Sequence, residues 1–242
     1  MLELWNAHVS TCSQKVRMAL AEKGLDWTDR QINFTRGDHL SDWYLKLNPN
    51  GVVPTLVHDG EPVIDSSVID EYLDDVFPDA PLRPADPRAR ARMRAWRQYI
   101  DEVPTPAIRV PSFHLVFRRI WADATPEAFD RHSERLPLRK HFYEMRSGGF
   151  SDEDMREALE KLDQTVGRME DALSDGRPWL VGDQFTLADV SVMPTIVRLE
   201  DLRLEVLWAE RPSVTAWYER LKGRPAFPAT YYPGTRDLTP SC

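Results

Sequence analysis

The hydrophobic pattern at the start of the chain predicts a strand that leads directly into a helix. Residues 2–5 form a short apolar run, and after Ser13 the apolar residues recur with helical spacing. The apolar side of this helix carries Val16, Ala19 and Leu20, and its polar side carries Gln14, Arg17 and Lys23. On this pattern Arg17 is a surface charge. Gly24 then ends the helix, because glycine readily adopts the left-handed conformation found there.

Strand and helix patterns continue up to about residue 77. The later strands are predicted at 29–32, 55–58 and 61–64, and the later helices at 41–47 and 66–77. The dipeptide Asp59-Gly60 separates the last two strands and is typical of a tight hairpin turn. The first part of the chain therefore has the order β-α-β-α-β-β-α.

The rest of the chain shows only helical patterns and follows a segment rich in proline. Four prolines fall within residues 78–87, which indicates a linker and a domain boundary. Helices are predicted at 88–103, from Thr125, at 151–173, from Thr186 and at 213–222. Three prolines follow residue 103, so the next helix is expected either to be broken or to start late, near Ser112. Residues from Pro225 onward show no pattern. We therefore expect an α/β domain at 1–78, a linker at 79–87 and an all-helical domain at 88–242.

Charge and composition exclude several classes of function. The net charge of −8 argues against nucleic-acid binding. No apolar run approaches the roughly 20 residues of a membrane span, and we expect no secretory signal. Cys12 and Cys242 lie at opposite ends of the chain, so we expect no disulfide framework and a cytoplasmic location. No cysteine or histidine spacing is typical of a metal site, so none is expected.

Small side chains with hydroxyl or thiol groups gather where the first strand meets the first helix. They are Ser10, Thr11, Cys12 and Ser13. The N-terminus of a helix presents unpaired N–H groups and the positive end of its dipole, so it stabilises anions, including a thiolate. The alternative interpretation is that these residues only cap the helix, since serine and threonine are preferred there for structural reasons.

Four motifs, in this order along the chain, resemble those of the cytosolic glutathione S-transferases. They are Ser10-Thr11-Cys12-Ser13, which is similar to the zeta-class Ser-Ser-Cys-Ser form; Asn48-Pro49 with Val53-Pro54; Asp65-Ser66; and Thr186-Leu187-Ala188-Asp189. The resemblance implies a thioredoxin-like N-terminal domain followed by an all-helical domain. It also implies a homodimer that uses glutathione as co-substrate, without a metal, against a hydrophobic electrophile.

The resemblance also assigns roles to the residues that carry it. Ser10 is the expected donor to the glutathione thiol, with Ser13 as the second choice. Cys12 is the third, and a mixed disulfide there would shift the chemistry toward thiol transfer. A protein that keeps the fold and binds glutathione without turnover is a further alternative.

The remaining parts of glutathione have expected partners as well. The backbone at Val53, before a cis Pro54, is expected to bind the cysteinyl part. Ser66 and Asp65 are expected to hold the carboxylate and the ammonium of the γ-glutamyl end, or else to serve only as a helix cap. His39 is expected to contact the glycine carboxylate, or else to be an exposed loop histidine.

A narrower similarity concerns bacterial transferases that cleave β-aryl ethers. Residues 39–43, 71–78, 82–87 and 125–150 carry it, and it implies an α-aryloxy ketone as substrate. We expect the substrate pocket between the two domains, above Ser10. Its candidate walls include His8, Val9, Phe113, Phe117 and Trp121, although aromatic residues in a helical domain are also typical of its core.

Overall fold

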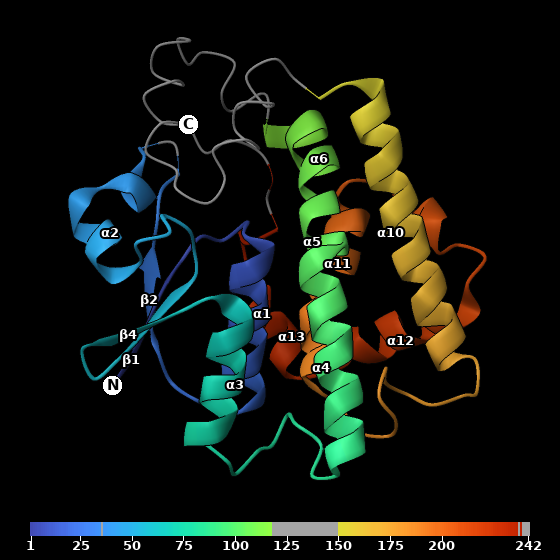
Figure 1. Ribbon diagram of the computed structural model, residues 1–242, viewed down its shortest axis with the longest axis horizontal. Coiled ribbons are helices and arrows are strands. Elements are labelled where there is room, and N and C mark those ends of the chain that lie inside the picture. The colour runs from blue at the N-terminus through green and yellow to red at the C-terminus, as the bar shows by residue number, and fades with distance from the viewer. Residues whose placement is uncertain (35, 118–149, 237, 239–242) are drawn as a thin grey trace.

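The computed structural model describes residues 1–34, 36–117, 150–236 and 238 (Figure 1). Its sheet has four strands in the order β2-β1-β3-β4. The strands are β1 (Leu2–Asn6), β2 (Thr28–Gln31), β3 (Thr55–His58) and β4 (Glu61–Ile64). β1 runs parallel to β2 and antiparallel to β3, and β3 and β4 are antiparallel. The sheet is therefore mixed, and the predicted strand positions hold to within one residue.

The hairpin between β3 and β4 forms at the predicted dipeptide. Asp59 has φ 51° and Gly60 has φ 93°, and positive φ at both central residues is what the favoured two-residue hairpin turn requires. Pro62 of β4 lies opposite Val57 of β3, and β4 is an edge strand. An edge strand tolerates proline because one of its sides has no ladder partner.

Three helices complete the first half of the chain. They are α1 (Thr11–Glu22), α2 (Asp42–Leu47) and α3 (Ser66–Val76), and a single 3₁₀ turn, Asp38–Leu40, precedes α2. α1 packs against α3 on one side and against helices of the second half on the other. Figure 1 shows α1 between the sheet and those helices. This position explains why residues from Ser13 to Leu20 are all buried.

The described helices of the second half pack into the same core as the first. They are α4 (Pro87–Glu102), α5 (Pro104–Ala107), α6 (Arg109–Ser112), α10 (Asp152–Leu173), α11 (Leu187–Asp201), α12 (Pro212–Lys222) and α13 (Ala226–Thr230), with a π-helical turn at Phe113–Phe117 and a 3₁₀ turn at Glu205–Leu207. α11 is buried from Leu187 to Leu199 and packs against both α1 and α4. One hydrophobic core therefore runs through both halves.

Two of these helices begin with the capping boxes that their sequences suggest. Ser151 and Asp154 exchange side chain to backbone hydrogen bonds at the start of α10. Thr186 and Asp189 form the corresponding cap of α11. The Asp189 carboxylate also accepts a hydrogen bond of 2.9 Å from Trp217 Nε1. This buried cap therefore joins α11 to α12.

The structure corrects two expectations for the helical half. Helical structure resumes at Pro104 as two short helices, because a proline is tolerated in the first turn of a helix, where its missing N–H costs nothing. The helical segment is therefore broken, as one alternative predicted, and the other alternative, a late start near Ser112, is wrong. The tail predicted to lack structure contains α13, which packs on α1. The helix predicted from Thr125 lies outside the described residues, and the domain boundaries stay a prediction.

Candidate functional site

Ser10 stands at the N-terminal end of α1, at the close of a tight turn. The Ser10 backbone N–H donates to the Ala7 carbonyl over 3.0 Å. The Ser10 side-chain oxygen accepts a hydrogen bond of 3.2 Å from the backbone N–H of Ser13. Ser10 is therefore the N-cap of the helix, as one interpretation of the sequence predicts. Among the described residues its hydroxyl proton has no acceptor, so the same group is still able to donate to an anion.

Ser13 and Cys12 occupy different surroundings from Ser10. The Ser13 side chain is fully buried, and its hydroxyl accepts a hydrogen bond of 3.4 Å from the backbone N–H of Ala7. It thereby ties the start of the turn to the first turn of α1. Cys12 is half-buried in that same first turn of the helix. Both the hydroxyl of Ser10 and the thiol of Cys12 thus lie at the positive end of the α1 dipole.

The start of α3 is a second helix N-terminus built around a strained residue. Asp65 has φ 71°, a region that side chains other than glycine rarely occupy. Its carboxylate accepts hydrogen bonds of 2.9 and 3.3 Å from the backbone N–H groups of Ser67 and Val68. Ser66, the first residue of the helix, is buried. The predicted cap is therefore present, and one carboxylate oxygen of Asp65 takes both bonds.

The segment before β3 is held in place by buried polar side chains. The peptide bond between Val53 and Pro54 is cis. The hydroxyl of Tyr44 and the amide of Asn48 each donate to the Val52 carbonyl over 2.8 Å. Because these bonds fix the segment from the α2 side, its backbone is preorganised before any ligand arrives. Tyr44 was not expected from the sequence, where it reads only as an apolar position of α2.

His39 lies in the core rather than on a loop surface. It is 1% exposed and sits edge-on to Phe34, with ring centroids 4.9 Å apart. The interpretation of His39 as an exposed loop histidine is therefore wrong. The reason is that the segment before α2 folds inward as a 3₁₀ turn and buries both His39 and Leu40.

A group of charged side chains lies behind the N-terminus of α3. Lys15 of α1 is almost fully buried, and its ammonium contacts an Asp101 carboxylate oxygen over 2.6 Å. The other Asp101 oxygen accepts a hydrogen bond of 2.6 Å from the Ser67 hydroxyl. Burial acts to raise the pKa of Asp101, but Lys15 and Ser67 outweigh it and lower the pKa. α1, α3 and α4 therefore meet through a charged carboxylate.

Asp70 lies in the same region without any hydrogen bond to the described residues. It is fully buried on α3, and its nearest cation is Arg97, whose Nη2 is 3.8 Å from Asp70 Oδ2. Arg97 instead donates to Glu71 over 2.6 Å and to the Ser67 carbonyl. Burial raises the pKa of Asp70 to about 7, against the opposing influence of Arg97 and Lys15. Asp70 is therefore a carboxyl group that titrates near neutral pH.

Arg17 is fully buried, so its interpretation as a surface charge is wrong. Its guanidinium donates to Asn6 Oδ1 over 2.8 Å and to the Thr230 carbonyl over 3.1 Å. It also donates to the His8 carbonyl over 3.0 Å, within the turn before Ser10. A helix covered by α13 as well as by α11 has no solvent side, and the pattern of α1 alone does not reveal this.

The structure brings some of the predicted pocket residues together. The rings of Phe113 and Phe117 have centroids 5.3 Å apart. Arg198 of α11 lies 5.6 Å from the Phe117 ring centroid and donates to the Val9 carbonyl. His8 is exposed and contacts the Tyr232 hydroxyl over 3.1 Å. The predicted pocket stays a prediction, because Trp121 and much of the segment 125–150 lie outside the described residues.

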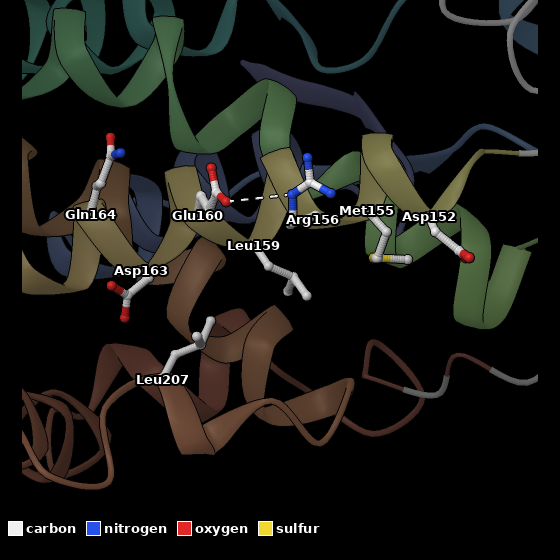
Figure 2. A pocket seen from close by; sticks show the side chains of 8 residues that line it. All are labelled: Asp152, Met155, Arg156, Leu159, Glu160, Asp163, Gln164 and Leu207. Atoms are coloured by element: carbon white, nitrogen blue, oxygen red, sulfur yellow. Dashed lines mark ion pairs between the residues drawn. The ribbon is translucent and has the colours of Figure 1, made fainter.

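A groove is present elsewhere, along α10 (Figure 2). It has a volume of about 580 Å³ and is lined by Asp152, Met155, Arg156, Leu159, Glu160, Asp163, Gln164 and Leu207. In Figure 1, α10 lies on the side of α4, α5 and α6 away from the sheet and α1. The groove is therefore separate from the residues around Ser10.

The described ranges contain neither a metal-binding cluster nor a helix able to cross a membrane. No group of three or more His, Cys, Asp or Glu side chains is arranged to hold a metal ion in them. Within the same ranges, no helix combines the length and the apolar character that crossing a membrane requires.

The chain matches models of a known family in both halves. Residues 9–76 match the glutathione S-transferase N-terminal domain, and residues 120–220 match the glutathione S-transferase C-terminal domain. The protein LigF of Sphingobium sp. (strain NBRC 103272 / SYK-6) is 31% identical over 245 residues, which cover 98% of this chain and 95% of LigF. Maleylacetoacetate isomerase of Pseudomonas aeruginosa is 30% identical over 244 residues, which cover 99% of this chain and all of the isomerase.

The fold agrees with these matches. The crystal structure of β-etherase LigF from Sphingobium sp. strain SYK-6 superposes with a TM-score of 0.87 and 30% identity, covering 95% of this chain and 98% of that one. The predicted fold class, a thioredoxin-like domain with a mixed sheet followed by a helical domain, is thereby confirmed. The chain belongs to the glutathione S-transferase family of enzymes.

Proposed function

We propose that Ser10 stabilises the thiolate of bound glutathione for attack on a hydrophobic electrophile. The observation that carries this proposal is the position of Ser10 at the N-cap of α1, with a hydroxyl proton that no described residue accepts. Ser13 is fully buried whereas Ser10 is partly exposed, which favours Ser10 over Ser13 as the hydroxyl that a ligand can reach. Cys12 is the remaining candidate.

The energetics of thiol ionisation agree with this role. An unperturbed cysteine thiol has a pKa near ~8.5, so little of it is thiolate at neutral pH. A hydrogen bond to a charged acceptor contributes about 1.5–3 kcal/mol, and the positive end of a helix dipole contributes about 0.3–1 kcal/mol. Together they lower the thiol pKa by about two units, since one unit corresponds to about 1.4 kcal/mol.

The rest of the tripeptide has partners in the first half of the chain. We propose that the Val53 backbone next to Pro54 binds the cysteinyl part through N–H and C=O groups, as an added strand would. Ser66 binds the γ-glutamyl carboxylate at the N-terminus of α3, and the carboxylate oxygen that Asp65 does not use in capping pairs with the ammonium. We propose His39 as the residue near the glycine end, acting from within the core.

The proposed electrophile is an α-aryloxy ketone. The relation to β-etherase LigF supports this substrate class. In the reaction the thiolate sulfur bonds to the carbon that carries the aryloxy group. The carbon–oxygen bond breaks, and the aryloxide leaves with the electron pair. His8, Val9, Phe113 and Phe117 are the proposed pocket residues.

The test combines thiolate spectroscopy with turnover of an α-aryloxy ketone in three variants. Ser10→Ala is expected to raise the pKa of the bound thiol and to lower kcat/KM by roughly 10- to 100-fold, the loss of one hydrogen bond to a charged group. Cys12→Ser and Ser13→Ala serve as matched controls on the same turn and are expected to keep the thiol pKa.

The other outcomes separate the alternatives. If Cys12→Ser abolished turnover while Ser10→Ala left the thiol pKa unchanged, thiol transfer through Cys12 would replace the proposal. Binding of glutathione without turnover of any electrophile would indicate a glutathione-binding protein that is not an enzyme. We also propose that the protein is a homodimer, which light scattering coupled to size exclusion tests directly.

A further inference from the structure

Two buried arginines bind consecutive carbonyl groups in the turn before Ser10. Arg17 of α1 donates to the His8 carbonyl over 3.0 Å. Arg198 of α11 donates to the next carbonyl, that of Val9. The Val9 carbonyl belongs to the peptide bond that joins Val9 to Ser10. Guanidinium groups from both halves of the chain therefore hold the backbone on which Ser10 sits.

Both guanidinium groups are buried with little compensating charge. Arg17 is fully buried, and the opposite charge that acts on it, Asp29, forms no ion pair with it. Arg198 is 3% exposed, and its Nε is 4.0 Å from an Asp201 oxygen. That carboxylate is bound more closely by Arg236. Because arginine stays charged in proteins, two positively charged groups are bound to the turn before Ser10.

Arg198 also connects this turn to the helical half. Its Nη1 donates to the Ser112 hydroxyl over 3.2 Å, and its guanidinium lies over the Phe117 ring. The charged and titratable groups near Arg198 are Asp201 on its own helix and Tyr231 and Arg236 on the C-terminal segment.

A purely structural role explains this arrangement poorly. Burying a charge without a close partner costs free energy, and an uncharged side chain of similar volume would fill the space. The positive charge would stabilise an anion that forms nearby, because a cation within a few ångströms of an acid favours the ionised form of that acid. The anion that the proposed function supplies is the glutathione thiolate at Ser10.

We propose that Arg198 is a positioning residue that fixes Ser10 through the Val9 carbonyl and favours the thiolate form of glutathione by its charge. This inference rests on the proposed function. Arg198 lies in the helical half, outside the motifs at Ser10, Pro54 and Ser66. A residue of that half would thus influence the ionisation of the thiol.

The experiment titrates the thiolate absorbance of bound glutathione against pH in the wild type, Arg198→Met and Arg198→Lys. Arg198→Met is expected to raise the thiol pKa by about one unit and to lower kcat/KM by roughly 10-fold at pH values below the wild-type thiol pKa. The loss disappears at high pH, where the thiol is ionised in both proteins. Arg198→Lys keeps the charge, so it is expected to raise the thiol pKa only about half as much as Arg198→Met does.

The control is Arg211→Met. Arg211 is partly buried and bonds the Asp163 carboxylate and the Leu207 carbonyl, so its loss weakens packing without removing charge near Ser10. It is expected to leave the thiol pKa unchanged. If Arg198→Met folds, as judged by its thermal transition, and titrates like the wild type, the inference is overturned.

Two further outcomes keep the tests separate. If Arg198→Met does not fold, Arg198→Gln, which removes the charge but keeps an N–H donor for the Val9 carbonyl, decides the matter, and a thiol pKa equal to that of the wild type contradicts the inference. If the wild type itself shows no thiolate of bound glutathione, the proposed function fails, and this inference fails with it. A normal wild-type titration with an unchanged Arg198→Met curve overturns only the role of Arg198.

Discussion

Replacing Asp70 by asparagine is expected to make the protein lose less stability than the wild type as the pH rises from acid to alkaline. Asp70 is fully buried, has no hydrogen bond to the described residues and has a pKa raised to about 7. Asparagine has nearly the same shape and carries no charge at any pH. The variant therefore removes the titration of this carboxyl group while changing its packing little.

The sign and size of the effect follow from the raised pKa. In the unfolded chain an aspartate has a pKa near ~3.9, so between that value and about 7 the folded protein binds one more proton than the unfolded chain. The stability that neutral Asp70 provides is complete below the unfolded pKa and is lost as the pH rises through the folded pKa. Each pH unit costs about 1.4 kcal/mol. The wild type thus loses about 3 kcal/mol between about pH 5 and about pH 7 through Asp70 alone.

The assay is urea unfolding of both proteins at one protein concentration and at several pH values between about 5 and 8.5. The difference in the free energy of unfolding, variant minus wild type, is expected to rise by about 3 kcal/mol across this range. Its absolute value at acid pH is free to take either sign, because the amide also presents N–H donors to Arg97 and Lys15. Only the change with pH tests the argument.

Asp74→Asn, on the same helix, is the matched control. The Asp74 carboxylate accepts hydrogen bonds of 2.7 to 2.8 Å from the Leu82 backbone, Lys23 and Arg83. Burial acts to raise its pKa, but these bonds outweigh it and lower the pKa. Its stabilisation is present above the unfolded pKa and is lost as the pH falls, so this variant is expected to lose stability at neutral pH. Parallel pH curves for Asp70→Asn and the wild type would refute the reasoning about Asp70.

Three further substitutions test other parts of the structure. Asp189→Ala leaves buried donors of Leu180, Thr186 and Trp217 without their acceptor, and urea unfolding is expected to show a loss of about 3–5 kcal/mol. Glu170→Ala removes the carboxylate that caps the N-terminus of α12. Urea unfolding is expected to show a free energy of unfolding lower by about 1–2 kcal/mol. An unchanged unfolding midpoint would contradict this capping role. Asn48→Ala removes one of the two hydrogen bonds that hold the Val52 carbonyl and leaves the one from Tyr44. Calorimetry is expected to show glutathione affinity reduced by roughly 10-fold, the value of one hydrogen bond, whereas equal affinity would argue against preorganisation of that segment.

Much of the fold follows from interactions between residues close in sequence. The hairpin at Asp59-Gly60 and the capping boxes of α10 and α11 depend on groups within a few residues of one another. Such local chemistry is visible in a sequence. α13 is the opposite case, because its short helix is stabilised by packing on α1, more than two hundred residues earlier.

The same distinction divides the candidate site. The cap at Ser10 and the cap at Asp65 are local, so both positions were predictable. The charged groups beneath them were not, because Arg17, Arg198 and Asp70 acquire their roles only from residues far along the chain. In a helical pattern a charged residue indicates solvent, and only the tertiary structure shows that these side chains face the interior.

The contact between α13 and α1 also has a consequence for biosynthesis. Arg17 completes its hydrogen bonds with the carbonyl of Thr230, which follows it by 213 residues along the chain. Until α13 leaves the exit tunnel, the first helix has an exposed side and Arg17 Nε lacks its carbonyl acceptor. The turn before Ser10 therefore gains its full set of contacts only once α13 has been synthesised, and a nascent chain stalled before α13 would lack them.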